Sequence, residues 1–132
     1  MSHVFFWEQQ GVVVRYAGDI HISEIQQAQD QLHGDARIDS ARYLIVDALA
    51  VTSIITTRSD EIDIWAYDAG ASIRNPRLLK AFVATLDEFV RFVTWYNGMH
   101  RAPYPSRVFD TEADARRWLQ SAMQIPLRNG EV

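Results

Sequence analysis

The stretch Tyr43-Leu-Ile-Val-Asp47 decides the fold class, because it is a short, continuous apolar run that ends at an acidic residue. Such a run is too short for a buried helix and is typical of a strand covered on both faces. Two further runs, Lys80-Ala-Phe-Val-Ala-Thr85 and Ser106-Arg-Val-Phe109, follow it, each after a helical pattern. Buried strands that alternate with helices require right-handed crossovers, so the three runs predict a parallel sheet.

Two runs near the N-terminus predict an antiparallel hairpin at one edge of this sheet. Val4-Phe-Phe-Trp7 and Val12-Val-Val-Arg-Tyr16 are rich in β-branched and aromatic residues, and Glu8-Gln-Gln-Gly11 connects them. We expect Gly18-Asp19 to end the second strand, because both residue types favour turns.

Four helices are predicted, each led by a hydroxyl side chain that can cap a helix start. These residues are Ser23, Thr57, Thr85 and Thr111, paired with Gln26, Asp60, Glu88 and Asp114 three positions later. The stripes expected to face the sheet are Ile22, Ile25, Ala28 and Leu32; Ile62, Trp65, Ala66 and Ala69; Leu86, Phe89, Val90 and Val93; and Ala115, Trp118, Leu119 and Ala122. Gly34, Gly70 and Asn97-Gly98 are expected ends of the first three helices, and Pro126 of the fourth.

The predicted architecture is therefore one α/β domain with a single mixed, mostly parallel sheet and an antiparallel edge hairpin, in the order β-β-α-β-α-β-α-β-α. We expect this domain to span residues 1–125 and a C-terminal tail to follow over residues 126–132. A chain of 132 residues matches the size of a single domain.

The composition argues against most kinds of site chemistry. The chain has no cysteine, which excludes disulfides, thiolate metal sites and cysteine nucleophiles. The phosphate-binding motifs G-x-G-x-x-G and G-x-x-x-x-G-K-[ST] and the nucleophile motif G-x-S-x-G do not occur, and the 4 histidines lack metal-ligand spacing. We therefore predict no metal, no cofactor and no catalytic residue.

Charge and hydropathy give expectations about location and partners. The net charge is −4 with scattered arginines, which does not favour nucleic-acid binding. Charges interrupt every apolar run, so no membrane insertion is expected. The N-terminal stretch lacks the basic and apolar regions of a signal peptide, and we therefore expect a cytoplasmic protein.

Two carboxylates keep an enzymatic interpretation open. Asp47 and Asp87 both follow predicted parallel strands, and ligands of open α/β sheets bind at the carboxyl ends of their strands. Acidic residues at these positions more often cap a turn or a helix.

The segment from Asp47 to Arg58 is the most informative part of the chain. It is expected to run from the buried strand through a loop to a helix start, where free N–H groups favour an added negative charge. Thr57, and with it Thr56, is therefore a candidate phospho-acceptor, or else a plain helix cap.

The same segment resembles the STAS domains of anti-sigma-factor antagonists, the SpoIIAA-like group, whose pattern reads roughly Asp-x-Ser-x-Val-x-x-x-Asp-Ser-Ser-Gly. Asp47 and Val51 match this pattern, and Thr56 and Thr57 fall on its paired serines, the second of which is phosphorylated in the family. Ile55 stands in place of the family's Asp, and Arg58 in place of its Gly. The resemblance extends over nearly the whole chain and is closer still to small stand-alone SpoIIAA-like bacterial proteins, through Tyr16-Ala-Gly-Asp19, Arg42-Tyr-Leu-Ile-Val-Asp47 and Val108-Phe-Asp-Thr-Glu-Ala-Asp-Ala-Arg-Arg-Trp-Leu119.

The third predicted helix carries a second apolar stripe, Phe92, Trp95 and Tyr96, turned away from the first. A helix that is apolar on two sides is either buried on both or awaits a partner. These rings are candidate contacts of a homodimer; alternatively, the Pro103–Pro105 loop or the neighbouring helix covers them through Trp65 and Tyr67.

These observations predict a non-enzymatic protein-interaction or regulatory module that recognises an unknown protein partner. The expected recognition surface is the loop and helix start from Thr52 to Asp60, with Thr52, Ser53, Arg58, Ser59 and Asp60 as its candidate residues. One alternative is a carrier of an apolar, lipid-like small ligand, because the fold resembles lipid-binding CRAL-TRIO domains and 4 Trp and 6 Phe residues could line a pocket. A second alternative is a phosphoswitch at Thr57.

Overall fold

The computed structural model describes the backbone of residues 3–98 and 104–131, and the side chains of these residues up to 123. Its centre is a five-stranded sheet in the order β1-β2-β3-β4-β5. The strands are β1 (His3–Trp7), β2 (Gly11–His21), β3 (Tyr43–Ile55), β4 (Leu79–Val83) and β5 (Ser106–Phe109). Strand β1 pairs antiparallel with β2, and every other pair is parallel, which confirms the predicted sheet.

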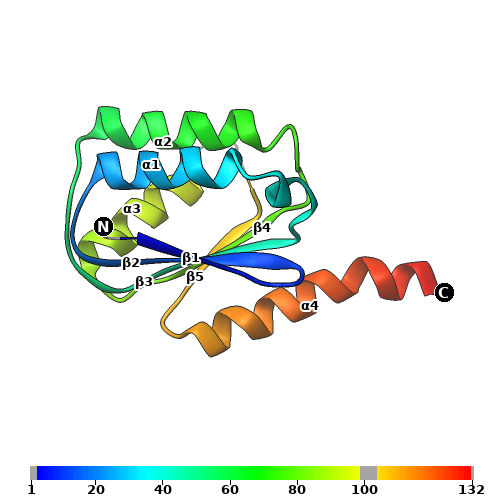
Figure 1. Ribbon diagram of the computed structural model, residues 1–132. Helices are drawn as coiled ribbons and strands as arrows, with labels where there is room; N and C mark the ends of the chain where they lie inside the picture. Colours follow the sequence, from blue (N-terminus) through cyan, green and yellow to red (C-terminus); the bar gives the residue numbers. More distant parts are fainter. Residues whose placement is uncertain (1–2, 99–103, 132) are drawn as a thin grey trace.

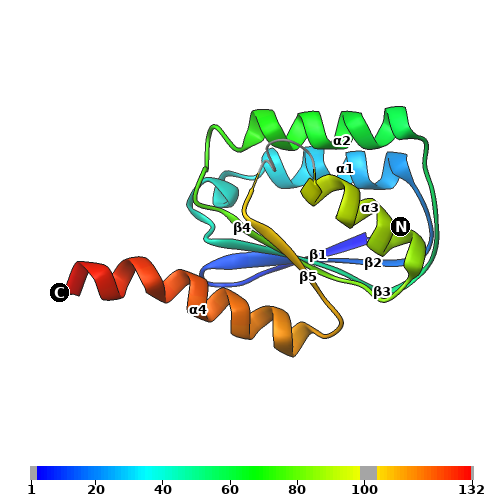
Figure 2. The same ribbon diagram turned by 180° about the vertical axis from the view of Figure 1, so that it is seen from behind.

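Helices cover both faces of this sheet, as Figures 1 and 2 show. Helices α1 (Ile22–His33), α2 (Arg58–Ala71) and α3 (Asp87–Gly98) lie on one face, and α4 (Glu112–Glu131) lies on the other. A short 3₁₀ helix, η1 (Ala36–Ser40), precedes β3. The predicted order of elements is confirmed.

Strand β3 shows why the run Tyr43–Val46 is apolar at every position. Leu44 and Val46 belong to the larger core beneath α1, α2 and α3. Tyr43 and Ile45 belong to the smaller core beneath α4. Successive side chains of a strand point to opposite faces, so a strand with helices on both sides has no solvent-facing positions.

Strands β2 and β3 are longer than the sequence predicts. β2 continues through Gly18-Asp19 to His21, and β3 continues past Asp47 to Ile55. The two extensions pair with each other, and the register shifts near Gly18, whose φ is 79°. A residue at positive φ accommodates such an irregularity without ending the strand, because glycine carries no Cβ.

Several helix ends also differ from the sequence prediction. Helix α1 starts at Ile22, and its N-cap residue is His21 without a side-chain cap, so Ser23 is a first-turn residue and not the cap. Helix α3 starts at Asp87, two residues after Thr85. Helix α4 continues past Pro126 to Glu131, where it projects beyond the sheet (Figure 2). A proline removes one helical hydrogen bond but is compatible with helical φ.

Candidate functional site

The predicted recognition segment lies where β3 ends and α2 begins. Thr52 and Ser53 are part of β3, so the expected loop is reduced to Thr56 and Thr57. These residues form a strand and not the predicted loop because they pair with β2, and each residue added to a parallel ladder gains hydrogen bonds that a free loop would lack. The segment is therefore a rigid strand end followed at once by a helix start.

Thr57 is the N-cap residue of α2. Its hydroxyl oxygen accepts a hydrogen bond from the Asp60 backbone N–H at 3.2 Å, and the Asp60 carboxylate accepts one from the Thr57 N–H at 3.2 Å. This reciprocal pair is a capping box and satisfies two N–H groups that the helix leaves free. The helix-cap interpretation of Thr57 is confirmed, and its phosphorylation, like that of Thr56, stays a prediction.

Thr52 and Ser53 converge on a residue that the sequence did not single out. Both hydroxyls donate to Asp19 Oδ1 at 2.8 Å, which joins the ends of β3 and β2. The Ser53 hydroxyl first, and the Thr52 hydroxyl second, hold the pKa of Asp19 below its ordinary value. This exposed end of the sheet therefore presents a fixed carboxylate.

A surface groove of about 290 Å³ separates the start of α2 from α3. Its apolar floor comes from Ile54 and Phe92, and Trp95 forms part of its wall. The full lining is Ile54, Thr56, Arg58, Glu61, Glu88, Arg91, Phe92 and Trp95. Two cations, two anions and an aromatic wall offer a partner both ion pairs and apolar contact, a combination found at protein interfaces. We call this feature the α2–α3 groove.

Arg58 is part of the groove lining and contacts two other lining residues. Its guanidinium lies over the Trp95 ring, 4.6 Å from the ring centroid, and pairs with Glu61 at 3.3 Å. Of the predicted recognition residues, Arg58 therefore reaches the groove together with Thr56, whereas Ser59 is exposed outside its lining. Asp60 is occupied by the capping box.

The three predicted dimer contacts on α3, Phe92, Trp95 and Tyr96, differ in how deeply they are buried. Phe92 is 5% exposed and Tyr96 is fully buried, so both belong to the core of a single chain. The predicted division of α3 into two stripes was wrong, because the buried face is formed by Phe89, Phe92, Val93 and Tyr96. Trp95 is half-buried beneath Arg58 and remains accessible to a partner.

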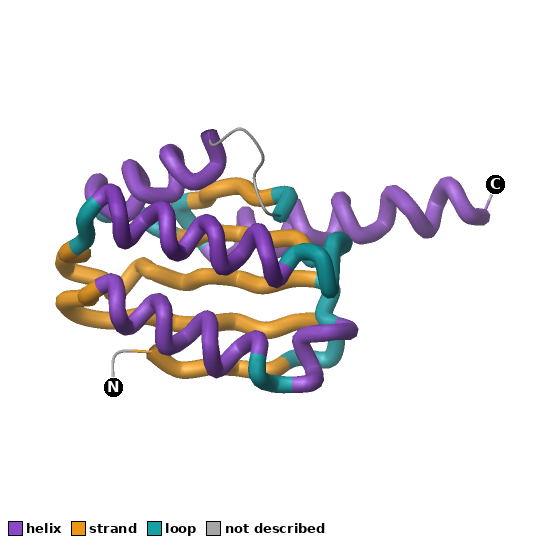
Figure 3. Tube along the Cα trace, turned by 90° about the horizontal axis from the view of Figure 1, so that it is seen from above, coloured by secondary structure: helices purple, strands orange, loops and turns teal. Residues whose placement is uncertain are grey.

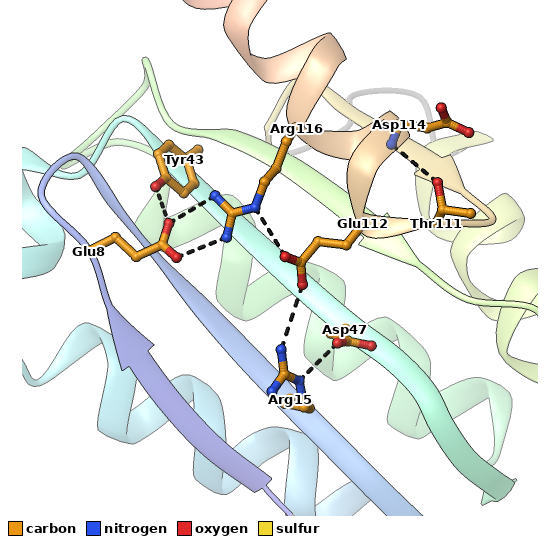
Figure 4. A network of polar contacts seen from close by, with 8 residues as sticks. All are labelled: Glu8, Arg15, Tyr43, Asp47, Thr111, Glu112, Asp114 and Arg116. Carbon is orange, nitrogen blue, oxygen red and sulfur yellow. Dashed lines mark hydrogen bonds and ion pairs between the residues drawn. The ribbon is translucent and has the colours of Figure 1, made fainter.

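Asp47 belongs to a chain of ion pairs on the α4 side of the sheet (Figure 4). Its carboxylate accepts from Arg15 Nε at 2.9 Å and from the Leu49 N–H at 3.1 Å. Arg15 also pairs with Glu112 at 3.6 Å, and Glu112 pairs with Arg116 of α4 at 3.1 Å.

The other end of this chain of ion pairs fixes the β1–β2 connection. Arg116 donates to both oxygens of Glu8, at 3.1 and 2.8 Å, and Tyr43 donates its hydroxyl to the same carboxylate. The Arg116 hydrogen bonds lower the pKa of Glu8. The network ties α4 to β2, to β3 and to the β1–β2 connection.

The two candidate carboxylates do not form a common site. Asp47 is buried within the network on the α4 side, whereas Asp87 is an exposed first residue of α3, on the opposite face of the sheet. Asp87 follows the end of β4, as predicted, but the prediction that Asp47 ends its strand was wrong, because β3 runs eight residues beyond Asp47 to Ile55.

A buried polar cluster beneath α1, α2 and α3 was missed by the sequence analysis. Lys80 Nζ donates to Asp68 Oδ2 at 2.7 Å, and the Tyr96 hydroxyl donates to the same oxygen at 2.5 Å. Gln29 donates to Asp68 Oδ1 at 3.0 Å and to the Ile64 carbonyl at 3.1 Å. The available signal was a lysine at the head of an apolar strand run, a position that requires a buried counter-charge.

This cluster borders a cavity of about 40 Å³. An apolar cavity of roughly 150 Å³ is needed to hold benzene, so this one has room only for water. The predicted alternative of a lipid-like ligand carrier therefore has no support from this cavity.

Comparison with known proteins supports the fold. No protein-family model matches the chain, and no curated protein matches it. Among solved structures, the anti-sigma factor antagonist SpoIIAA in its unphosphorylated form matches with a TM-score of 0.56 at 12% identity, over 89% of this chain and 97% of that one. An anti-sigma factor antagonist from Mycobacterium paratuberculosis matches with a TM-score of 0.56 at 15% identity, over 89% and 92%. A DUF3478-family protein with a SpoIIAA-like fold from Shewanella loihica PV-4 matches with a TM-score of 0.48 at 12% identity, over 89% and 91%.

The sheet order and the placement of the helices thus define an α/β domain with one mixed sheet. This domain has the SpoIIAA-like fold. Among the residues described, no helix is long and apolar enough to cross a membrane.

Proposed function

We propose that this chain is a non-enzymatic regulatory module that binds a protein partner in the α2–α3 groove. The observation that carries the proposal is the groove itself, which places Arg58, Arg91 and Trp95 around an apolar floor. Arginine and tryptophan dominate the binding energy of protein interfaces, because they combine a large contact area with directed polar groups.

The position of the groove supports the same function. It lies beside the start of α2, the region in which the resemblance to anti-sigma-factor antagonists predicts recognition. Two of the solved structures with this fold are described as anti-sigma factor antagonists, a name that implies action on another protein. A cytoplasmic location is part of this proposal.

Affinity purification from cells that make the protein tests the proposal. We expect Arg58→Ala and Trp95→Ala each to release a partner that the wild-type chain retains, because each substitution removes one half of the cation–π pair. Arg117→Ala is the matched control, because Arg117 is an exposed arginine on α4, on the other face of the sheet.

A photoreactive residue in place of Thr56, which lines the groove, should cross-link to the same partner. Retention of that partner by both groove variants, or its loss in Arg117→Ala alone, would place binding elsewhere and contradict the proposal.

A phosphoswitch at Thr57 remains a second proposal, with the hydroxyl as acceptor. Phosphopeptide mapping tests it: we expect a modified peptide containing Thr57 in cells under some growth condition. Recovery of only the unmodified peptide under all growth conditions would contradict the phosphoswitch proposal.

A further inference from the structure

Helix α2 presents an apolar stripe to solvent. Ile62, Ala66 and Ala69 recur at helical spacing, and Ile73 continues the stripe in the turn that follows the helix. Ile62 is 44% exposed and Ile73 is 82% exposed. The sequence predicted that Ile62, Ala66 and Ala69 face the core. That prediction was wrong, because the buried positions of α2 are Ile64 and Asp68.

The placement of α2 explains why this stripe is open. Figure 1 shows α2 as the outermost helix of its layer, and Figure 3 shows the same helix from above, between α1 and α3. One exposed isoleucine is ordinary on a protein surface. An apolar row that runs from Ile62 to Ile73, with the small residues Ala66 and Ala69 at its centre, provides a surface on which a second helix can pack closely.

Two charges flank the stripe on the side that faces α1. Asp63 is exposed on α2, about 100° around the helix from the buried Ile64. Arg74 is exposed in the turn after α2 and extends toward Asp39, which lies in η1 directly after α1. Arg74 pairs within the chain with Asp39 at 2.6 Å; this pair is itself exposed and contributes little to stability. The N-terminal half of the flank is therefore acidic and its C-terminal end basic.

We propose that the stripe is the contact surface of a symmetric dimer, in which the α2 helices of two copies pack antiparallel. A two-fold axis that crosses the stripe between Ala66 and Ala69 places Ile62 of one copy against Ile73 of the second copy. The same axis places Asp63 against Arg74 of the second copy, and symmetry repeats the pair. A parallel two-fold arrangement would bring opposite flanks of α2 together and leave Asp63 of one copy far from Arg74 of the other, so the charge complementarity favours the antiparallel arrangement.

This dimer leaves the α2–α3 groove accessible. Arg58 and Glu61 project from the other flank of α2, toward Trp95 of α3. Partner binding and dimerisation therefore use different surfaces, and either can fail without the other. An interface built on one helix pair is small, and we expect a dissociation constant on the order of micromolar or weaker.

Sedimentation equilibrium of the full chain, from about 1 μM to about 1 mM, tests the proposal across the range in which such interfaces dissociate. We expect a concentration-dependent dimer for the wild type and a monomer for Ile73→Asp. Ile55→Asp is the matched control, because Ile55 is 57% exposed on β3 and should leave the dimer intact. A wild-type chain that stays monomeric throughout, or a dimer that survives Ile73→Asp, would overturn the proposal.

The charge pair provides an independent test of the arrangement. Asp63→Arg and Arg74→Asp should each raise the dissociation constant about tenfold, and the double exchange should restore it, because it rebuilds both pairs in reverse. Asp39→Asn should have no such effect. Failure of the double exchange to restore dimerisation would contradict the antiparallel pairing.

The absence of cysteine allows a direct geometric check. Ala69→Cys places a thiol beside the proposed two-fold axis and should form a disulfide-linked dimer on mild oxidation. Ala113→Cys, at an exposed position on α4, should not. Equal cross-linking of the two variants would contradict the proposal.

Discussion

Lys80 Nζ lies 2.7 Å from Asp68 Oδ2, and both side chains are almost fully buried, at 8% and 2% exposure. Lys80 comes from β4 and Asp68 from α2, so the pair fastens α2 to the sheet. This ion pair is important for holding α2 in place, because Ile64 is the only buried apolar residue of the helix. A buried charge is tolerated only with a partner and hydrogen bonds, and here Tyr96 and Gln29 supply them.

Breaking this pair from one side should strongly destabilise the protein. We expect Lys80→Met to lower the free energy of unfolding by about 3–5 kcal/mol, because it leaves Asp68 buried without its cation. Urea unfolding at pH 7 measures the change. The double variant Lys80→Met/Asp68→Leu should cost less than Lys80→Met alone, because no charge then remains buried. A loss below about 1 kcal/mol in Lys80→Met would show that the pair does not hold α2.

His33 should make stability depend on pH. Burial lowers its pKa, with Asp68 opposing that shift and Lys80 adding to it. Below pH about 6.5 the unfolded chain takes up a proton that the folded chain resists, so stability contributed by neutral His33 is lost as the pH falls. Thermal unfolding measured from about pH 8 to about pH 5, a range that brackets this value, tests the prediction. As the pH falls, the melting temperature should decline less steeply for His33→Gln than for the wild type. His21→Gln, a substitution at an exposed histidine, is the comparison variant.

Thr57→Ala should lower the free energy of unfolding by about 1 kcal/mol, because it removes the acceptor for the Asp60 N–H. Thr57→Ser should keep most of the stability, since the hydroxyl remains. Ser23→Ala is the matched control: Ser23 looks like a cap in the sequence but does not cap α1, so its loss should have little effect. Chemical denaturation of the three variants distinguishes these outcomes, and an equal loss in Thr57→Ala and Ser23→Ala would refute the assignment.

Gly11→Ala should destabilise the chain by roughly 1–3 kcal/mol, because the added methyl group would meet the Tyr43 ring at 2.5 Å. Gly70→Ala should instead raise stability by about 0.5–1 kcal/mol, because a Cβ at Gly70 meets nothing within 4 Å and alanine favours a helix. Differential scanning calorimetry should therefore show a lower melting temperature than the wild type for Gly11→Ala and a higher one for Gly70→Ala. The prediction fails if Gly11→Ala melts at or above the wild-type temperature.

The sequence predicted an element well where the signal for that element is local, and poorly where a distant part of the chain sets its limits. Strand β5 was predicted with its observed bounds, because a short β-rich run between prolines and an acidic turn is a local signal. The end of β3 was not predicted correctly, because its last residues pair with β2, a strand that is distant in the sequence. The Thr57 cap was correctly predicted and the Ser23 cap was not, although both show the same spacing, because β2 already runs to His21 and sets where α1 begins.

The sequence by itself determined the α/β class, the parallel sheet with its edge hairpin and the hydroxyl cap of α2, because local patterns of apolar, turn and capping residues signal each of them. Only the tertiary structure decided which side of α2 faces inward, since periodicity defines an apolar row without saying what will cover it. Asp68 and Lys80 settle that orientation: once their charges meet inside, Ile62 and Ile73 are turned to solvent. The α2–α3 groove arose in the same way, from two helices that the sheet holds side by side.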